Sequence, residues 1–499
     1  MSTASFDDYL CGASLSSTGC PPPGGRTADV TQGLLKYDLD GHLINEATMN
    51  IKKTNSISCI LLSKSSLTKE NIRRIPFYPK EKNSPLVYSS GRWNFNPSKK
   101  PKQSNSDTGS STDATGSSEP GMTSEDSNAT WDDDEYDGVM DRGSKRKRKR
   151  NTTSRMTTEK ILEHLFKAIV YTLRKPLRDK TTFNIPPQSE SVKRYWSSEF
   201  SASPIPDLYN SQKPDLALFD YRNKKLPKTW ADVLSFIEHT ASDFSKRQDL
   251  PVYWGSSTKA YLVMREQPWR RFVIYFTIAA DRIRTHYLDR SGLIISLPTD
   301  IHSSPVRIAE AIGTVSLADQ KMLGFDDTIH MCIPHCKGSH ANLADGAIGW
   351  VYNNSGKQYS IMDVLWKSQG LFCRGTVCYR VRDPEDGIDY AMKDCWVAEA
   401  KRYHEVDVLK KVKGIPNVVE LVDHWDVKYG DQDDCTDLIR RQYSREDRRD
   451  KKFCNRYHRR LVMKPCGEPL SRFKSRKELI CAFRDFVVGE FGFNVPNRG

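Results

Sequence analysis

The sequence predicts an α+β protein with a long disordered N-terminal segment, then a mixed α/β region, then an antiparallel sheet with one helix. Three observations support this fold class. Residues 97–153 are mostly Ser, Thr, Asp, Gly and Lys, residues 161–173 repeat apolar side chains at helical spacing, and short β-rich runs follow from residue 271 onward. Because 499 residues exceed what one compact core accommodates, we expect more than one folded region.

Composition and charge exclude several classes of protein. Lys and Arg number 76 against 63 Asp and Glu, the formal charge is +13, apolar residues make up 37%, and mean hydropathy is −0.63. No uncharged apolar run approaches the roughly 20 residues of a membrane helix, and the start, MSTASFDDYLCG, lacks the pattern of a secretion signal. The 12 cysteines contain no Cys-x-x-Cys pair, which is typical of a reducing compartment. We expect a soluble protein of the nucleus or cytoplasm with no membrane partner.

The first 153 residues divide into two segments. Residues 1–96 hold short apolar pieces separated by Gly, Pro and Ser, and they indicate no chemistry; residues 97–153 are predicted to be a disordered linker. The linker contains an unbroken basic run that consists of Lys145, Arg146, Lys147, Arg148, Lys149 and Arg150. Such a run fits the acidic groove of a nuclear import receptor, and the alternative is a solvated charge block.

Residues 154–365 are predicted to form the α/β region. Apolar residues over 161–173 recur every three or four positions and stop before Pro176, which predicts an amphipathic helix. The runs RFVIYFTI, IRTHYLDR and GLIISLP within residues 271–298 predict an antiparallel meander, because they are β-rich and broken by turn residues. A second helix is expected over residues 305–313.

Residues 366–499 contain four pieces in a fixed order. Residues 371–381 (LFCRGTVCYRV) and 390–393 (YAMK) are predicted strands around a turn, a helix with Val408 and Leu409 on its sheet-facing side follows, and a strand at residues 460–463 comes last.

This order resembles the small lobe of a protein kinase. In that lobe a glycine-bearing hairpin lets the backbone approach the nucleotide phosphates, a strand lysine pairs with the α and β phosphates, and a helix glutamate holds the lysine. By this resemblance Gly375, Lys393 and Glu405 fill the three roles.

Longer phrases narrow the resemblance to the fungal-type protein kinase family, over roughly residues 155–490. The phrases are RGT at 374–376, MKDCW at 392–396, HRRLV at 458–462, GEPLSRF at 467–473 and KELICAFRDFV at 477–487, with PDL at 214–216, LDRSG at 288–292 and LGFDDTI at 323–329 upstream. The resemblance implies a kinase-like fold, ATP as the nucleotide and a Ser or Thr substrate. It also places Met463 at the gatekeeper position and Lys464 in the hinge, where an acidic residue is commoner.

The sequence departs from the kinase pattern at two places. Cys373 and Cys378 stand where glycines of a full G-x-G-x-x-G loop are expected, which restricts backbone approach to the phosphates. No H-R-D loop, second-metal asparagine or D-F-G follows the hinge, so the ligands for Mg²⁺ are absent and we expect a kinase-like module truncated before the catalytic loop and inactive alone. His458-Arg459-Arg460 is expected to lead into a strand. The alternatives are an incomplete sequence, or a pseudokinase or scaffold module that binds an unknown protein partner.

A second pattern is similar to that of metal-dependent nucleases. Pro214-Asp215 and Glu238 match their Pro-Asp and Glu, whose carboxylates bind Mg²⁺, but Thr240 occupies the position of the lysine that polarises water. Residues 185–300 are therefore expected to have at most a nuclease-like core, and we expect no catalysis there.

Two further patterns favour solvated segments. The cluster HMCIPHCKGSH at 330–340 suggests zinc, but adjacent His335 and Cys336 fit no closed site, so we expect a surface loop. Residues 440–452 (RRQYSREDRRDKK) mix acids into a basic run and are expected to be a solvated insertion without nucleic-acid binding.

Overall fold

The structure is a computed structural model. It describes residues 43–45, 88–89, 91–93, 157–174, 193–207, 210–221, 226–241, 251–332, 343–368, 370–443, 454–467 and 473–494. The predicted linker at 97–153 and its basic run at 145–150 lie outside the described residues. Within those residues, no helix combines the length and the apolar character needed to cross a membrane.

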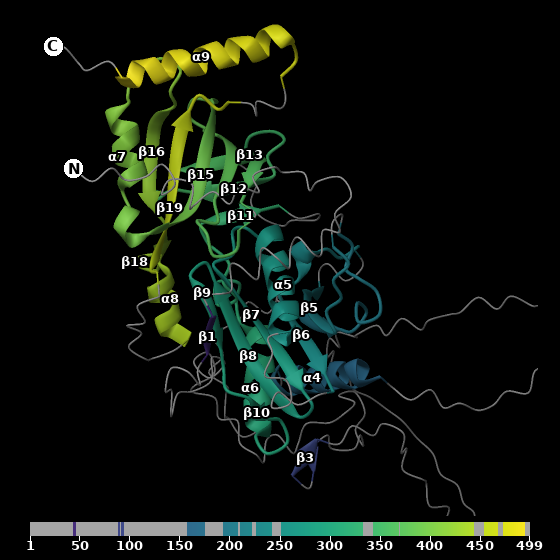
Figure 1. The fold of residues 1–499 in the computed structure, drawn as a ribbon. Helices are drawn as coiled ribbons and strands as arrows, with labels where there is room; N and C mark the ends of the chain where they lie inside the picture. Colours follow the sequence, from purple (N-terminus) through teal and green to yellow (C-terminus); the bar gives the residue numbers. More distant parts are fainter. Residues whose placement is uncertain are drawn as a thin grey trace, which may run out of the picture. The chain divides into compact units, whose positions relative to one another are not determined.

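The predicted α/β region contains a mixed sheet with strand order β1-β9-β8-β7-β6-β5-β4 (Figure 1). Its strands are β1 (Leu43–Asn45), β4 (Arg194–Ser197), β5 (Leu216–Asp220), β6 (Ser235–Thr240), β7 (Phe272–Ala279), β8 (Arg282–Asp289) and β9 (Gly292–Ile295), with β10 (Thr299–Asp300) paired to β8. The predicted meander is confirmed, because β7, β8 and β9 pair antiparallel in sequence order. β6 and β7 are parallel, and helix α5 (Pro251–Glu266) supplies the crossover that parallel neighbours need.

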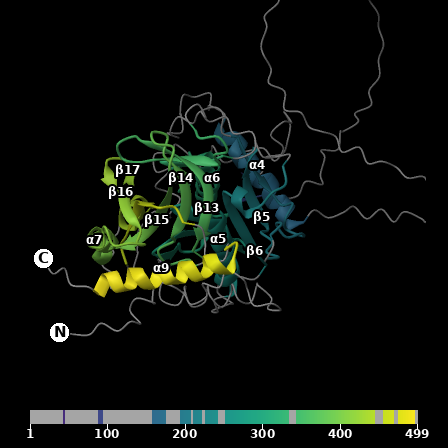
Figure 2. The same cartoon turned by 90° about the horizontal axis from the view of Figure 1, so that it is seen from above.

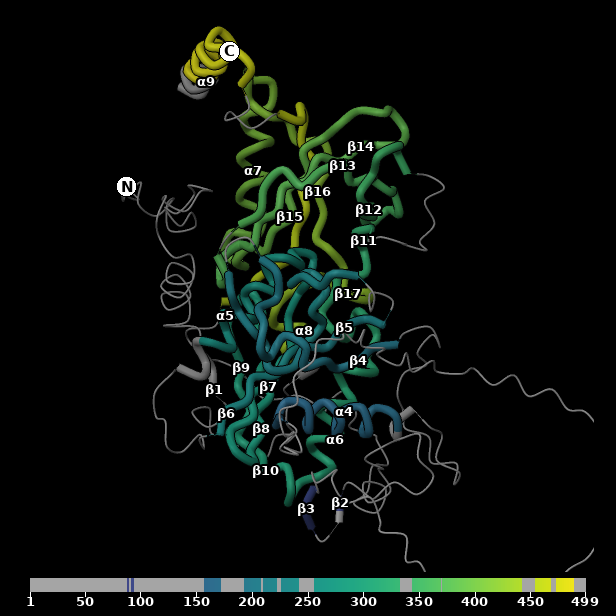
Figure 3. The backbone as a smooth tube through the Cα atoms, turned by 90° about the vertical axis from the view of Figure 1, so that its right-hand side faces the viewer, coloured from purple at the N-terminus to yellow at the C-terminus, as the bar shows by residue number. Residues whose placement is uncertain are grey.

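Helices cover both faces of this sheet. Alternate residues of β7 point to opposite faces, so Phe272 and Ile274 join the core under α4 (Thr158–Arg174) and α6 (Pro305–Leu317), while Val273 and Tyr275 join the core under α5. Figure 3 shows α4 beside α6, with which it packs. The predicted helix at 161–173 is confirmed. The helix expected at 305–313 continues to Leu317, because buried apolar residues extend through its last turn. A short 3-10 turn, η3 (Trp230–Asp232), precedes β6.

The predicted kinase-like small lobe contains an antiparallel sheet with strand order β11-β12-β13-β14-β15-β19-β16 (Figure 1). Its strands are β11 (Ile329–Met331), β12 (Gly349–Tyr352), β13 (Gln358–Lys367), β14 (Val377–Arg382), β15 (Asp389–Ala398), β16 (Glu420–Asp426) and β19 (Arg456–Lys464). The sheet includes β11 and β12, whose residues precede the domain boundary expected at residue 366; that boundary stays a prediction.

The first predicted strand of the small lobe begins later than expected. β14 starts at Val377, and Leu371 and Phe372 precede it as buried members of the core under α5. The sequence could not show this, because an apolar pair before a strand fits an extension of that strand as well as a contact with another sheet.

Helix α7 (His404–Lys411) packs on β16 (Figure 2). Val406 and Leu409 are buried there against Leu461 of β19. The prediction for Leu409 is confirmed, but the one for Val408 is wrong, because Val408 is 40% exposed. Val406 and Leu409 are three residues apart and share a helix face, which Val408 does not.

The remaining elements are short or lie at the surface. They are β2 (Tyr88–Ser89), β3 (Arg92–Trp93), η5 (Glu399–Lys401), β17 (Lys428–Tyr429), β18 (Gln432–Asp433), α8 (Thr436–Tyr443) and α9 (Arg476–Asn494). The β2–β3 hairpin docks on the α/β region, where the indole of Trp93 donates a hydrogen bond to the carbonyl oxygen of Ile301 at 2.8 Å.

The two valines of α7 give a matched test of this packing. We expect Val406→Ala to lower the free energy of unfolding by about 2 kcal/mol, because it removes buried methyl groups. Val408→Ala on the same helix should change it by less than about 0.5 kcal/mol. Urea unfolding of both variants measures the difference, and equal effects would contradict the packing of α7.

Candidate functional site

Lys393 and Glu405 form the centre of the candidate site. The Nζ of Lys393 donates to Oε1 of Glu405 at 2.5 Å. Lys393 lies on β15 between Cys378 of β14 and Leu461 of β19, and its side chain points to the face of the sheet that carries α7. The structure therefore brings together the lysine and the glutamate that the sequence singled out.

The site remains open to solvent and is rich in cations. The side chains of Lys393 and Glu405 are 18% and 34% exposed. Arg374 Nη1 lies 3.9 Å from Glu405 Oε2, so two cations converge on one carboxylate. Charge-assisted hydrogen bonds from such groups suit phosphate oxygens.

The cysteines beside Lys393 add no negative charge at neutral pH. Burial raises the pKa of Cys378, and it raises the pKa of Cys395 to about 12, although Lys393 lowers both. Both thiols therefore stay protonated and leave the Lys393 ammonium available to an anionic ligand.

The glycine loop is anchored on the α/β region. Gly375 has a φ of +52°, and a β carbon there would lie 2.6 Å from Nε of Arg290, so both the backbone and the space require glycine. Arg290 comes from the β8–β9 turn and also points Nη1 at the carbonyl oxygen of Leu371, 3.3 Å away. With Leu371 and Phe372 buried under α5, this loop is tied to the upstream sheet.

The two cysteines expected at glycine positions differ in place. Cys373 lies in the loop and its sulfur accepts a hydrogen bond from the Gly375 amide at 3.2 Å. Cys378 is the second residue of β14, directly after the loop, and its correspondence to the last glycine of the pattern stays a prediction. The strand begins at Val377, and the loop ends before it.

Met463 and Lys464 lie at the end of β19. Met463 packs partly buried against the core of α7, next to Ala391 of β15. Lys464 is exposed, and its Nζ lies 3.4 Å from Oε2 of Glu420. Their gatekeeper and hinge roles stay predictions.

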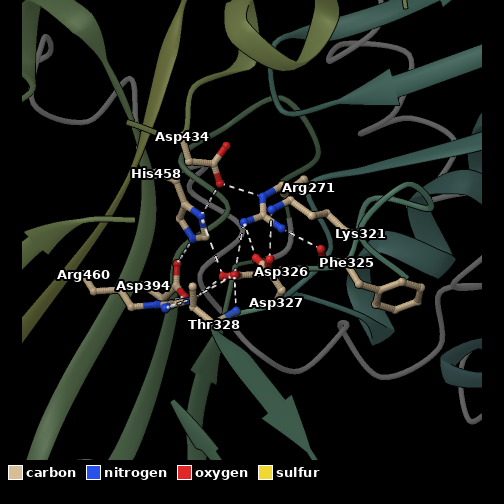
Figure 4. A network of polar contacts seen from close by, with 10 residues as sticks. All are labelled: Arg271, Lys321, Phe325, Asp326, Asp327, Thr328, Asp394, Asp434, His458 and Arg460. Carbon is tan, nitrogen blue, oxygen red and sulfur yellow. Dashed lines mark hydrogen bonds and ion pairs between the residues drawn. The ribbon is translucent and has the colours of Figure 1, made fainter. Parts of the chain in front are cut away.

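A buried ion-pair network joins the small lobe to the α/β region (Figure 4). Its members are Arg271, Asp326, Asp394, Asp434, His458 and Arg460. Arg271 precedes β7 and donates to Asp434 at 2.7 Å, and Arg460 of β19 donates to Asp326, which follows α6, and to Asp394 at 2.8 Å. All six side chains are at most one-tenth exposed, so the charges neutralise one another instead of being solvated.

His458 completes the charge balance of the network. Its ring nitrogens lie 2.6 Å from Asp394 and 3.1 Å from Asp434, and the ring stacks on Trp396. Burial alone would lower the pKa of His458, but the carboxylates outweigh it and raise this pKa to about 9. Burial alone would raise the pKa of Asp326, but the ion pairs with Arg460 and Arg271 outweigh it and hold this pKa below its usual value. At neutral pH the network therefore carries three positive and three negative charges. His458, Arg459 and Arg460 were expected to lead into a strand at residues 460–463; they lie within β19, which begins four residues earlier, at Arg456.

Asp326, Asp394 and His458 place ligand atoms within 4.8 Å of one another, the spacing of a metal site. The donor set does not fit a divalent cation, because both carboxylates already bind Arg460 and a metal would meet its guanidinium. The surface loop predicted at 330–340 is wrong for His330 and Met331, which lie on β11, where His330 stacks on Trp350; His335 and Cys336 lie outside the described residues.

A second buried ion pair joins the two sheets. Arg440 of α8 makes two hydrogen bonds to Asp289 at the end of β8, at 2.7 and 2.6 Å. Ser291 in the same turn binds Thr436 at 2.8 Å. The prediction of a solvated insertion over residues 440–452 is therefore wrong for Arg440, which is buried; residues 444–452 lie outside the described residues.

The residues of the nuclease-like pattern meet on neighbouring strands. Leu216 of β5 pairs with Ile237 of β6, so the next pair in this register is Asp215 and Glu238. Lys259 of α5 donates to Oε2 of Glu238 at 2.7 Å. Sequence analysis missed Lys259, because it reaches the carboxylates from a helix and not from strand position 240.

Comparison with known families decides the assignment. A family model described as fungal protein kinase matches residues 213–491, more than half of the chain. The chain belongs to this family. The match begins inside the α/β region and runs through β19 into α9. It covers the whole small-lobe sheet and strands β5 to β10 of the first sheet, while β1 and β4 precede it. No curated protein matches the chain.

The raised pKa of His458 gives a pH test. Between pH 6.5 and 8 the folded histidine keeps a proton that the unfolded one loses, so the free energy of unfolding falls as pH rises, at up to about 1.4 kcal/mol per pH unit. We expect His458→Gln to remove this slope. His424→Gln is the control. Burial lowers the pKa of His424, so this histidine affects the free energy of unfolding below pH 6.5 and not in the tested range. Urea unfolding across this range measures both, and an unchanged slope in His458→Gln would rule out the charged histidine.

Proposed function

We propose that residues 343–467 form a nucleotide-binding small lobe that takes ATP. The observation that carries this proposal is the 2.5 Å contact between Lys393 and Glu405 within the family match. In kinases this pair positions the lysine on the α and β phosphates. Arg374, 3.9 Å from the same glutamate, adds a second cation for the phosphate oxygens.

The anchored glycine loop makes ATP binding depend on the α/β region. Phe372 and Leu371 fix the loop on the core under α5, and Arg290 holds its carbonyl groups. A loop that is already ordered loses little conformational freedom when phosphate binds, which favours affinity.

Phosphoryl transfer to Ser or Thr is the activity that the family resemblance implies. Transfer requires an aspartate that orients the acceptor hydroxyl and another that holds Mg²⁺. No H-R-D or D-F-G motif stands in residues 1–499. We therefore propose that the chain with these 499 residues binds ATP without transferring phosphate, and that Mg²⁺ enters only with the nucleotide.

The second candidate is a scaffold module in which Lys393 and Glu405 form a structural ion pair. Helix α9 favours it, because it exposes Ile480, Phe483 and Phe486 to solvent. Exposed apolar side chains on one helix are typical of a protein-binding surface. ATP binding separates the two candidates.

We expect ATP to raise the melting temperature of the 499-residue protein. At about 100 times its Kd, ATP adds about 2.7 kcal/mol to the free energy of unfolding. Lys393→Ala should weaken ATP binding about tenfold or more, because it removes a charge-assisted hydrogen bond. Lys410→Ala on α7 is the matched control and should bind as the wild type does.

Two outcomes would contradict this proposal. Absence of any ATP-dependent shift in the wild type favours the scaffold. Equal shifts in the wild type and Lys393→Ala would mean that the phosphates lie elsewhere. Transfer of labelled phosphate from ATP, abolished by Lys393→Ala, would refute the expectation of an inactive chain.

A further inference from the structure

We propose that Asp215, Glu238 and Lys259 form a second site, which binds a divalent cation and hydrolyses a nucleic-acid phosphodiester. The site lies in the α/β region and is independent of the proposed ATP site. It departs from two expectations drawn from the sequence, namely a nuclease-like core without catalysis over residues 185–300 and the absence of a nucleic-acid partner.

The first argument is the arrangement of the two carboxylates. Asp215 directly precedes β5 and Glu238 lies on β6, each one residue beyond the Leu216–Ile237 pair, and Asp215 Oδ2 accepts a hydrogen bond from the backbone amide of His239 at 2.6 Å. This bond holds the Asp215 carboxylate beside Glu238. Two carboxylates from adjacent strands are the protein ligands that Mg²⁺ or Mn²⁺ takes when water and substrate oxygens complete its shell.

The second argument is an oxygen atom without a partner. Glu238 Oε2 binds Lys259, but Oε1 is buried and accepts no hydrogen bond from the described residues. A buried carboxylate oxygen without a partner is costly, and a bound cation would satisfy Oε1.

The third argument is the lysine, which distinguishes this site from an acidic cluster. The side chain of Lys259 is 7% exposed and that of Glu238 is 18% exposed, so the ammonium is held in the site beside a mostly buried carboxylate. Lys259 acts electrostatically on Asp215 as well as on Glu238. Thr240 occupies the strand position of the nuclease lysine, and Lys259 supplies the same group from α5.

These groups suffice for hydrolysis with water and a divalent cation as co-reactants. The cation held by Asp215 and Glu238 binds a water molecule and a phosphate oxygen. The water oxygen attacks phosphorus and the bond from phosphorus to the leaving sugar oxygen breaks. One proton of the water ends on that sugar oxygen, and the other remains with the new phosphate monoester. The Lys259 ammonium stabilises the negative charge that develops on the phosphate oxygens.

Metal binding is tested with Mn²⁺ on the 499-residue protein, by electron paramagnetic resonance titration. We expect saturable binding in the wild type and about tenfold or weaker binding in Asp215→Asn. This variant keeps an oxygen that accepts the His239 hydrogen bond, so the fold is preserved. Asp220→Asn at the other end of β5 is the control. Absence of binding in the wild type, or equal binding in Asp215→Asn, overturns the site.

Hydrolysis is tested with single-stranded DNA and RNA in separate reactions containing Mn²⁺ or Mg²⁺. We expect cleavage of at least one substrate that disappears without metal, in Asp215→Asn and in Lys259→Met, and persists in Asp220→Asn. Circular dichroism melting of each variant verifies its fold. If metal binds but neither substrate is cleaved, the hydrolytic part of the proposal is refuted. Loss of stability in Lys259→Met, with no metal binding in the wild type, identifies a structural ion pair.

Discussion

The buried network of Arg271, Asp434, His458, Asp394, Arg460 and Asp326 constrains the rest of the structure. Charges removed from water are tolerated only when each has its partner in good geometry. Because partners come from both sheets, the small lobe satisfies its charges only in one position against the α/β region. This position also fixes the glycine loop, because Arg290 of the α/β region binds the loop carbonyl of Leu371 and Phe372 of the loop is buried in the core under α5.

The contact between the small lobe and the α/β region explains the sequence phrases by which the chain resembles the family. In LDRSG, Asp289 binds Arg440, Arg290 supports the glycine loop and Ser291 binds Thr436. In LGFDDTI, Asp326 belongs to the network, and Gly324 is required because a β carbon would lie 2.4 Å from the carbonyl oxygen of Phe272.

The phrase HRRLV has the same explanation. His458 and Arg460 face the network, and Arg459 binds Asp426 at 2.8 Å on the other side of β19. Its likeness to the start of a catalytic loop is thus superficial, because these side chains hold two sheets together.

Sequence reasoning predicted local structure well and contacts between distant segments poorly. The α4 helix and the meander followed from periodicity and β-rich runs, and the Lys393–Glu405 pair was implied by the resemblance to a kinase small lobe. Phe372, Arg440 and Lys259 could not be placed, because each contacts a partner far along the chain. An apolar residue beside a strand, or a charge in a basic run, has the same pattern whether it meets solvent or another sheet.

A double-mutant cycle on Arg271 and Asp434 tests the central claim most directly. The variants are Arg271→Met, Asp434→Leu and the double variant, and urea unfolding measures the free energy of each. The same cycle on the half-exposed pair Lys321 and Asp327, whose Nζ and Oδ2 lie 3.0 Å apart, is the control. The account predicts a coupling free energy of about 2 kcal/mol or more for Arg271 and Asp434, and less than about 1 kcal/mol for the exposed pair. Additive effects of Arg271→Met and Asp434→Leu would contradict it, because the two sheets would then be held together without this network.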